Sequence, residues 1–230
     1  MHDILSTATY FGVMISILSY ELGLWIKKKT KSPICNPLLI SIIVTIVVLL
    51  LLHVDYQSYN AGAQYLSYLL TPATVCLAIP LYEQLTLLVR NVKAILVGIV
   101  AGVLASVGSV FGLCILFGLN HQYYVTLLPK SITTAIGMGV SEELGGIVTI
   151  TVSVIIITGV LGNIIAETVC KLCRITEPVA KGIAIGSASH AIGTARALEM
   201  GEVEGAMSSL AIAVAGLITV VVSSVFANLI

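Results

Sequence analysis

The chain has 230 residues, of which 58% are hydrophobic and 10% are charged, and its mean hydropathy is +1.08. This composition excludes an ordinary soluble domain and indicates an integral membrane protein. The formal net charge is zero, so there is no electrostatic case for a nucleic-acid partner. Because one crossing of a bilayer takes about 20 apolar residues, we expect an all-α polytopic membrane protein with about seven to eight transmembrane or partial helices.

The N-terminal region predicts two plain helices. The first is expected from Ile4 to Ile26 and runs into the basic segment 27–31, KKKTK. By the positive-inside rule this segment faces the cytoplasm, which places the N-terminus outside and the chain in the cytoplasmic (inner) membrane as a multi-pass protein. The second helix is expected from Leu38 to His53, where Ile, Val and Leu dominate as in a lipid-facing scaffold.

Prolines and polar residues then interrupt the apolar pattern. A helix break is expected at Thr71-Pro72, and Tyr123–Gly146 predicts a segment that dips into the membrane and returns, broken at Pro129. A third polar interruption covers Gly182 to Gly205. Uninterrupted apolar helices are expected at Val92–Leu119, Ile147–Leu172 and Ala206–Ile230. We predict a single membrane domain (1–230) made of scaffold helices (1–55), a first broken-helix unit (56–119) and a second broken-helix unit (120–230).

The two proline-broken segments resemble each other. Residues 65–85 read YLSYLLTPATVCLAIPLYEQL, residues 124–144 read YVTLLPKSITTAIGMGVSEEL, and Pro72 aligns with Pro129. The match is either an internal repeat or a coincidence between apolar segments. Paired discontinuous helices point to the central binding site of a transporter. Pro72, Pro129, Gly145 and Gly146 are the predicted breaks or hinges.

Lys130 and the hydroxyls that follow it predict an anion site. An ammonium at membrane depth is costly, which suggests a bound partner. Ser131, Thr133 and Thr134 add hydrogen-bond donors at the start of a new helix, whose free N–H groups carry partial positive charge. A small carboxylate anion suits this arrangement. The alternative is that Lys130 extends to the membrane surface and the hydroxyls only cap the helix.

Two further groups could carry a coupled ion. Glu142 could hold a proton or pair with Lys130, unless it and its neighbour Glu143 are ordinary loop charges. His190 could also carry a proton. On a helix, Ser187, His190 and Thr194 would share one face. Ser189, His190 and Thr194 are further candidates for substrate binding. The histidine could equally be a plain hydrogen-bond partner between helices.

Catalytic and metal chemistry are not indicated. There is no nucleophile elbow and no Asp after Asp55, which argues against a hydrolase. Cys170 and Cys173 form a lone CxxC spacing without further ligands nearby. We expect no enzymatic activity, no catalytic residue, no metal and no cofactor.

Two segments resemble the LrgB/CidB family, which includes the C-terminal half of the plant plastid glycolate/glycerate translocator. They are LPKSITTAIGMGVSEELGGI and GIAIGSASHAIGTARALEMGEVEGAMSSLAI, and the resemblance extends over essentially the whole chain. It implies one of two functions. Some members look like carriers of short monocarboxylates such as pyruvate, glycolate or glycerate, and others look like antiholin-like regulators of murein hydrolase activity and autolysis with a smaller LrgA/CidA-type membrane partner.

These two functions make different predictions. An ion-coupled carrier working by alternating access, our main hypothesis, would gather Lys130, its hydroxyls and His190 around a small pocket at mid-membrane. A regulator would form a homo-oligomer in the lipid bilayer, with the segment Gly98–Gly112 at the subunit contact. Gly98 and Gly102, and again Gly108 and Gly112, have the small-xxx-small spacing that lets helices approach closely.

Overall fold

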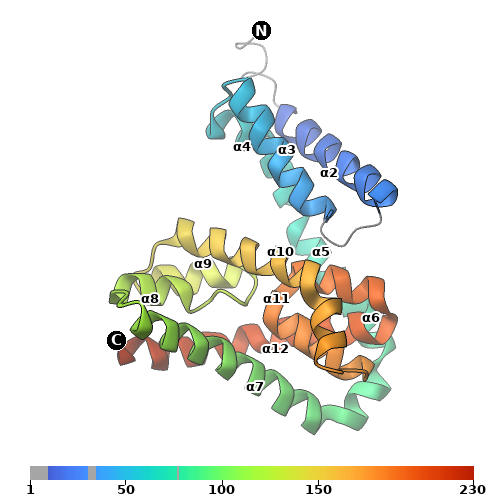
Figure 1. Ribbon diagram of the computed structural model, residues 1–230, viewed down its shortest axis with the longest axis vertical. Coiled ribbons are helices and arrows are strands. Elements are labelled where there is room, and N and C mark those ends of the chain that lie inside the picture. Colours follow the sequence, from blue (N-terminus) through green and yellow to red (C-terminus); the bar gives the residue numbers. More distant parts are fainter. Residues whose placement is uncertain (1–9, 31–34, 77) are drawn as a thin grey trace. The chain divides into compact units, whose positions relative to one another are not determined.

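The computed structural model describes residues 10–30, 35–76 and 78–230, and these segments are helical with short connections (Figure 1). Contacts divide the chain between residues 76 and 77 into two compact units, which we describe separately. Among the described residues, three helices are long and apolar enough to cross a membrane, which agrees with the expected all-α membrane fold. The predicted division at 55 and 119 remains a prediction.

The N-terminal unit is built on a pair of packed helices. It contains α2 (Phe11–Thr30), α3 (Pro37–Leu51), α4 (Tyr56–Ser67) and α5 (Leu70–Cys76). Helix α2 continues through the lysines that were expected to follow it, and its predicted start at Ile4 lies outside the described residues. Asn36 and Asp55 accept backbone hydrogen bonds that begin α3 and α4. Hydrogen bonds from the Ser58 side chain and backbone lower the pKa of the exposed Asp55 carboxyl.

The break expected at Pro72 falls slightly earlier. Helix α4 ends at Ser67 and α5 begins at Leu70, so Pro72 is the third residue of α5. A proline in the first turn of a helix removes no intrahelical hydrogen bond, because the first N–H groups have no partner there. The correspondence between residues 65–85 and 124–144 remains a prediction.

The second unit contains the long helices. Its elements are α6 (Ala78–Glu83), α7 (Leu85–Leu116), α8 (His121–Leu127), α9 (Thr134–Glu143), α10 (Val148–Leu172), α11 (Pro178–Met200), α12 (Glu202–Phe226) and η1 (Ala227–Leu229). Helix α7 starts seven residues before the predicted Val92, since the polar residues Arg90 and Lys93 are accommodated on its exposed face.

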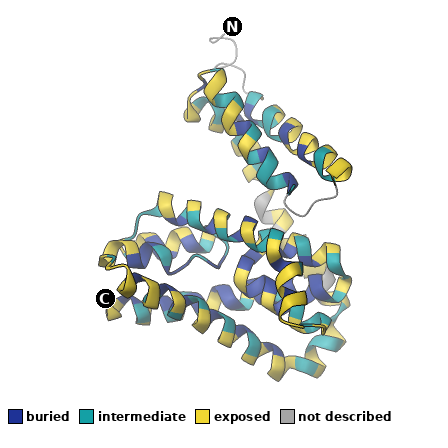
Figure 2. Ribbon diagram, in the orientation of Figure 1, coloured by how far each residue is buried: buried dark blue, intermediate teal, exposed yellow. Residues whose placement is uncertain are grey.

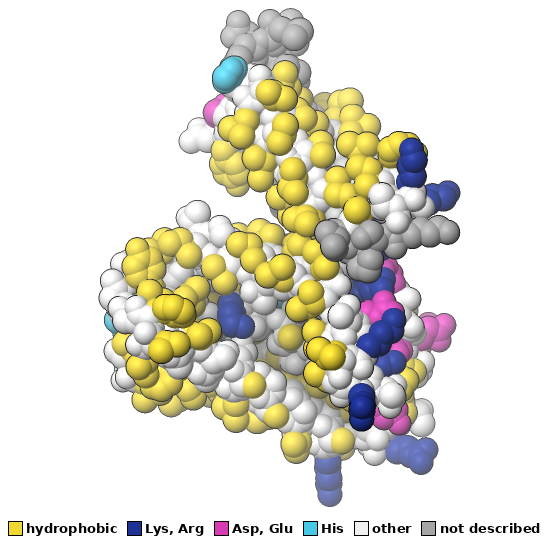
Figure 3. All heavy atoms as spheres, viewed as in Figure 1, with side chains coloured by type: hydrophobic (Ala, Val, Ile, Leu, Met, Phe, Trp, Pro, Cys, Tyr) yellow, Lys and Arg dark blue, Asp and Glu magenta, His cyan; other side chains and the backbone are white. Residues whose placement is uncertain are grey.

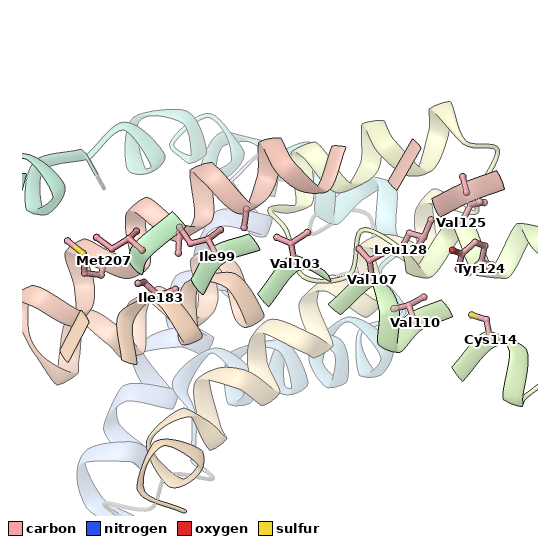
Figure 4. Packing of buried hydrophobic residues seen from close by; sticks show 14 of the residues in the cluster. Ile99, Val103, Val107, Val110, Cys114, Tyr124, Val125, Leu128, Ile183 and Met207 are labelled. Atoms are coloured by element: carbon pink, nitrogen blue, oxygen red, sulfur yellow. The ribbon is translucent and has the colours of Figure 1, made fainter. Parts of the chain in front are cut away.

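The core of this unit follows one stripe of α7. Ile95, Ile99, Val103 and Val107 recur every fourth residue and are at most 2% exposed. They pack with Tyr124 and Leu128, and with residues of α11 and α12, in a single cluster (Figure 4). The opposite faces of the long helices carry exposed aliphatic side chains, as expected of helices surrounded by lipid (Figure 2).

Residues 121–143 form a first hairpin that turns back at Leu128–Thr133, as predicted for the broken segment. On its inward arm, Tyr124 lies against Phe111 of α7, while Ser131 at the turn reaches Ser106. On the returning arm, Ser141 bonds to Thr151 near the start of α10. Gly145 has a φ of +78° and connects the hairpin to α10, so this glycine acts as a turn.

Residues 178–200 form a second hairpin, which overlaps the polar interruption predicted from Gly182 to Gly205. His190 has φ 42° and ψ −143°, and the chain reverses there. The inward arm packs Gly186 against Ser208 and Ala211 of α12, and the returning arm brings Thr194 back to Ser208. The expectation that Ser187, His190 and Thr194 share one helix face is therefore wrong.

The two hairpins enter the second unit from opposite ends. The first lies between the end of α7 and the start of α10, and the second lies between the end of α10 and the start of α12. Charged side chains gather where α10 ends and the second hairpin begins and closes (Figure 3). We call this the basic end, after Lys171, Arg174, Lys181 and Arg196, and we call the other the opposite end.

Candidate functional site

A cavity of about 990 Å³ lies within the second unit. Its walls are α7, α10 and the inward arm of the second hairpin, and the turn of the first hairpin lies against it through Lys130 and Ser131. Glycine, alanine and serine make up much of the lining. Their small side chains leave this space open between helices that otherwise pack closely.

Lys130 belongs to a short chain of hydrogen bonds at the cavity wall. Its Nζ donates to Ser131 Oγ over 3.2 Å, and Ser106 Oγ on α7 donates to the same oxygen over 2.9 Å. Both lone pairs of the Ser131 hydroxyl are thus occupied, and its hydrogen is free for a ligand. Within the described residues Lys130 makes no ion pair. A half-buried cation beside a spare hydroxyl hydrogen is suited to binding an anion.

The polar lining comes from the centres of the long helices. Gly102 and Ser106 lie in the central third of α7, and Thr158 and Gly162 lie in the central third of α10. Ser189 comes from the turn of the second hairpin. Since α7 and α10 are long and apolar enough to cross a bilayer, these polar groups lie near the middle of two candidate membrane spans.

Ser189 is a second available donor in the cavity. The residue is 4% exposed, it lines the cavity, and its hydroxyl makes no hydrogen bond to the residues that the structure describes. Because this hydroxyl is open to the cavity, it can donate a hydrogen bond to a bound polar ligand. Ser187 differs, because its hydroxyl already donates to Ile183 O over 2.7 Å.

The structure brings together only part of the predicted site. Lys130, Ser131 and Ser189 line the cavity, whereas Thr133, Thr134, Glu142, His190 and Thr194 do not. Glu142 is exposed near the end of α9 and does not reach Lys130. Thr194 Oγ1 lies 2.6 Å from Ser208 Oγ in the contact with α12. Thr133 precedes the first residue of α9 without capping it through its side chain.

His190 holds the turn of the second hairpin against α10. Its Nε2 lies 3.0 Å from the carbonyl oxygen of Ile155, and its ring packs on Gly159. One turn further along α10, Gly162 leaves room for Ser189, since a Cβ there would overlap that side chain. The positive φ of His190 is strained for any residue except glycine. The contacts with α10 therefore impose this conformation.

Sequence comparison places this architecture in a family. The family described as LrgB-like matches residues 16–229. The chain belongs to the LrgB-like family. The antiholin-like protein LrgB of Bacillus cereus strain B4264 is 39% identical over 223 residues, which is 96% of this chain and 97% of that protein. The antiholin-like protein LrgB of Bacillus anthracis strain A0248 gives the same figures. No solved structure matches the chain.

The hydroxyls on the walls of this LrgB-like cavity were missed by the sequence interpretation. Ser106, Ser109 and Thr158 lie inside long apolar helices and line the cavity. Isolated hydroxyls in apolar helices usually bond to their own backbone, as Ser109 does with Ser106 O. The one feature of the sequence that could have identified these residues as cavity-lining is their position near the centres of apolar helices.

A second cavity of about 650 Å³ lies at the basic end of the LrgB-like protein. Glu167 on α10 pairs with Lys171 and with Arg196 on the returning arm, and Arg196 also pairs with Glu199 at 2.6 Å. Lys181 lies 3.8 Å from Glu204 on α12. These ion pairs join both arms of the second hairpin to the neighbouring helices.

Proposed function

We propose that this LrgB-like membrane protein is a secondary carrier of small monocarboxylates of the pyruvate, glycolate and glycerate class, ion-coupled and working by alternating access. The observation that supports this most is the placement of Lys130, a cation without an ion-pair partner in the described chain, at a cavity between the centres of membrane-spanning helices. A lysine at the centre of a membrane helix costs about 2.5–3.5 kcal/mol on insertion scales. A bound carboxylate would offset that cost.

The single positive charge of Lys130 favours a monocarboxylate ligand over a dicarboxylate. Among the described residues that line the cavity, Lys130 is the one basic residue, and the one acidic residue, Glu177, belongs to the basic end. One cation neutralises one carboxylate, whereas a second negative charge would remain uncompensated. Hydroxyls of Ser131 and Ser189 can bind the oxygen that pyruvate, glycolate and glycerate carry on the second carbon.

The coupled ion in this proposal is a proton or sodium, with His190 preferred over Glu142 as the coupling residue. His190 is 2% exposed and adjoins Ser189, whereas Glu142 lies on the surface. A change of charge on the imidazole would disturb its contact with Ile155 O, and so the turn that carries Ser189. This would couple protonation to the shape of the cavity.

The orientation in the membrane follows from charge. Segment 27–29, Arg90, Lys93 and the basic end would face the cytoplasm by the positive-inside rule, with the N-terminus outside. The cytoplasmic membrane is the location that this assignment implies.

A second candidate function is an antiholin-like regulator of murein hydrolase activity and autolysis. The relatives are named antiholin-like proteins, which favours this function over the carrier. It would act as a homo-oligomer or with an LrgA/CidA-type partner. Gly108 and Gly112 are consistent with such a contact, because a Cβ at either position would meet no atom within 4 Å.

Uptake into liposomes tests the carrier. Purified protein would be reconstituted with and without a pH gradient and offered labelled pyruvate and glycolate. We expect gradient-driven uptake by the wild type and by Lys93→Ala, a matched control that removes an exposed lysine of α7, and no uptake by Lys130→Ala. Folded wild-type protein that takes up neither acid, even with its smaller partner added, would favour the regulator.

A further inference from the structure

The two hairpins are related by sequence. When residues are shifted by 56 positions, SITTAIGMGVSEELG at 131–145 aligns with SASHAIGTARALEMG at 187–201, and six of the fifteen positions are identical. The identical residues include the Ala-Ile-Gly that follows each turn. Thr133 aligns with Ser189, and Thr134 aligns with His190. The turns and the returning arms of the two hairpins are therefore related in sequence.

The same shift relates the helices that precede the hairpins. Each hairpin follows a long apolar helix, α7 in one case and α10 in the other, and the hairpins enter from opposite ends. A helix and its hairpin thus occur twice, in inverted directions. Inverted repeats of this kind surround the binding sites of many secondary transporters.

The same shift of 56 positions relates pairs of residues in the cavity wall. Five pairs of lining residues differ by 56 positions: Gly102 and Thr158, Ala105 and Leu161, Ser106 and Gly162, Ser109 and Ile165, Ser131 and Ser187. The central part of the cavity is therefore pseudo-symmetric. Lys130 breaks the symmetry, because its counterpart is Gly186.

The rest of the cavity extends toward one end only. It continues along α7 past Gly98 to Ala94, Asn91 and Leu87, and along the second hairpin past Ala184 to Val179. These residues lead to the basic end. Their counterparts lead to the opposite end and do not line the cavity. Two of these counterparts, Tyr124 and Leu128, are 0% and 1% exposed.

We propose that the protein has a second conformation in which the same central site opens to the opposite end, along a path lined by the counterparts of the present one. In that state the path runs between Ile150 and Val154 of α10 and Tyr123, Tyr124, Leu127 and Leu128 of the first hairpin. The second hairpin then closes the basic end as the first hairpin closes the opposite end now. The functional role of this second conformation rests on the proposed carrier function. Whether the second path opens can be tested without any substrate.

A disulfide between α7 and the second hairpin can lock the present conformation. A Cβ at position 102 would lie 3.2 Å from the Ser187 Cβ, close to the separation of about 3.5–4.5 Å in a disulfide. The double variant Gly102→Cys/Ser187→Cys should therefore join α7 to the second hairpin and prevent that hairpin from moving. Reduction would release it.

The test measures access of water to single cysteines. In a variant whose five native cysteines are replaced by alanine, cysteine is placed at Ala184 on the present path, and at Leu128 or Val154 on the path of the second state. Leu217→Cys on the exposed face of α12 is the control for a lipid-facing position. A membrane-impermeant maleimide is applied to intact cells and to inverted vesicles.

We expect Ala184→Cys to react from the side of the basic end, and Leu128→Cys and Val154→Cys to react from the other side. The Gly102–Ser187 disulfide should reduce labelling at Leu128→Cys and Val154→Cys by about tenfold or more and leave Ala184→Cys reactive. Labelling at both positions no faster than at Leu217→Cys, or unaffected by the lock, would overturn the proposal. The expected labelling pattern in a protein that fails the uptake assay would overturn the carrier but support two-way opening.

Discussion

The Ser106 hydroxyl on α7 donates a 2.9 Å hydrogen bond to the Ser131 hydroxyl at the turn of the first hairpin. This bond fixes the turn to a membrane-spanning helix and leaves the Ser131 hydrogen for a ligand. It also explains why Ser131 is 7% exposed although it lines a cavity.

Ser106→Ala should weaken carboxylate binding without abolishing it. The variant removes the donor that orients Ser131, and a hydrogen bond of this kind contributes about 0.5–1.5 kcal/mol, or roughly two- to tenfold in Kd. Titration of the purified protein with pyruvate checks this. Ser153→Ala, on the exposed face of α10, should leave Kd unchanged. A Kd equal to that of the wild type would show that the bond does not position Ser131.

Lys130→Met should stabilise the empty protein and remove ligand binding. The substitution keeps an unbranched side chain of similar length and removes a charge that lacks an ion-pair partner in the described structure. We expect a higher Tm in detergent without ligand. Pyruvate should raise the Tm of the wild type, because it binds the folded state, and leave the Tm of the variant unchanged. A lower Tm for Lys130→Met would indicate that the ammonium has a structural role.

Gly162→Ala should destabilise the second hairpin. A Cβ at this position would overlap Ser189, so α10 and the turn would have to move apart. Overpacking of this kind costs about 1–3 kcal/mol. Gly108→Ala is the matched control, since its Cβ would meet nothing within 4 Å and helical alanine is favoured over glycine by about 0.5–1 kcal/mol. In thermal unfolding experiments, Gly162→Ala should have a lower Tm than the wild type, and Gly108→Ala should have a higher one.

His190→Gly should be more stable than His190→Ala. Both variants lose the contact with Ile155 O, but only glycine adopts φ 42° and ψ −143° without strain, which costs of order 1–3 kcal/mol for other residues. Thermal unfolding of the two variants measures the difference. If His190 carries the coupled proton, both should also lose the dependence of uptake on a pH gradient. Equal Tm values would mean that the turn relaxes once the imidazole is removed.

The sequence predicted the parts whose cause is local. Apolar length alone identifies α7, α10 and α12 as membrane helices. Pro129 and the polar residues after it predict a broken segment, and the structure places Pro129 in the turn of the first hairpin. Lys130 could be predicted as a binding residue because an isolated charge in an apolar chain is costly unless it has a partner.

The second hairpin could not be predicted in the same way. Residues 178–200 contain no proline after the first, and the polar residues from Gly182 onward predict an interruption without fixing where the chain reverses. The reversal at His190 depends on Gly159 and Gly162 of α10, which lie more than 25 residues away and admit the turn. Local propensity contains no information about such a contact.

The sequence by itself determined that this is an LrgB-like helical membrane protein with broken helices and a lysine between apolar segments, because composition and apolar length act within each segment. Only the tertiary structure decided which groups meet at the cavity. It turned Glu142 outward, held His190 and Thr194 against neighbouring helices, and brought Ser106 and Ser189 to the cavity that Lys130 also lines. The reason is physical: the face that a residue presents depends on where the chain reverses, and that is set by packing between distant helices.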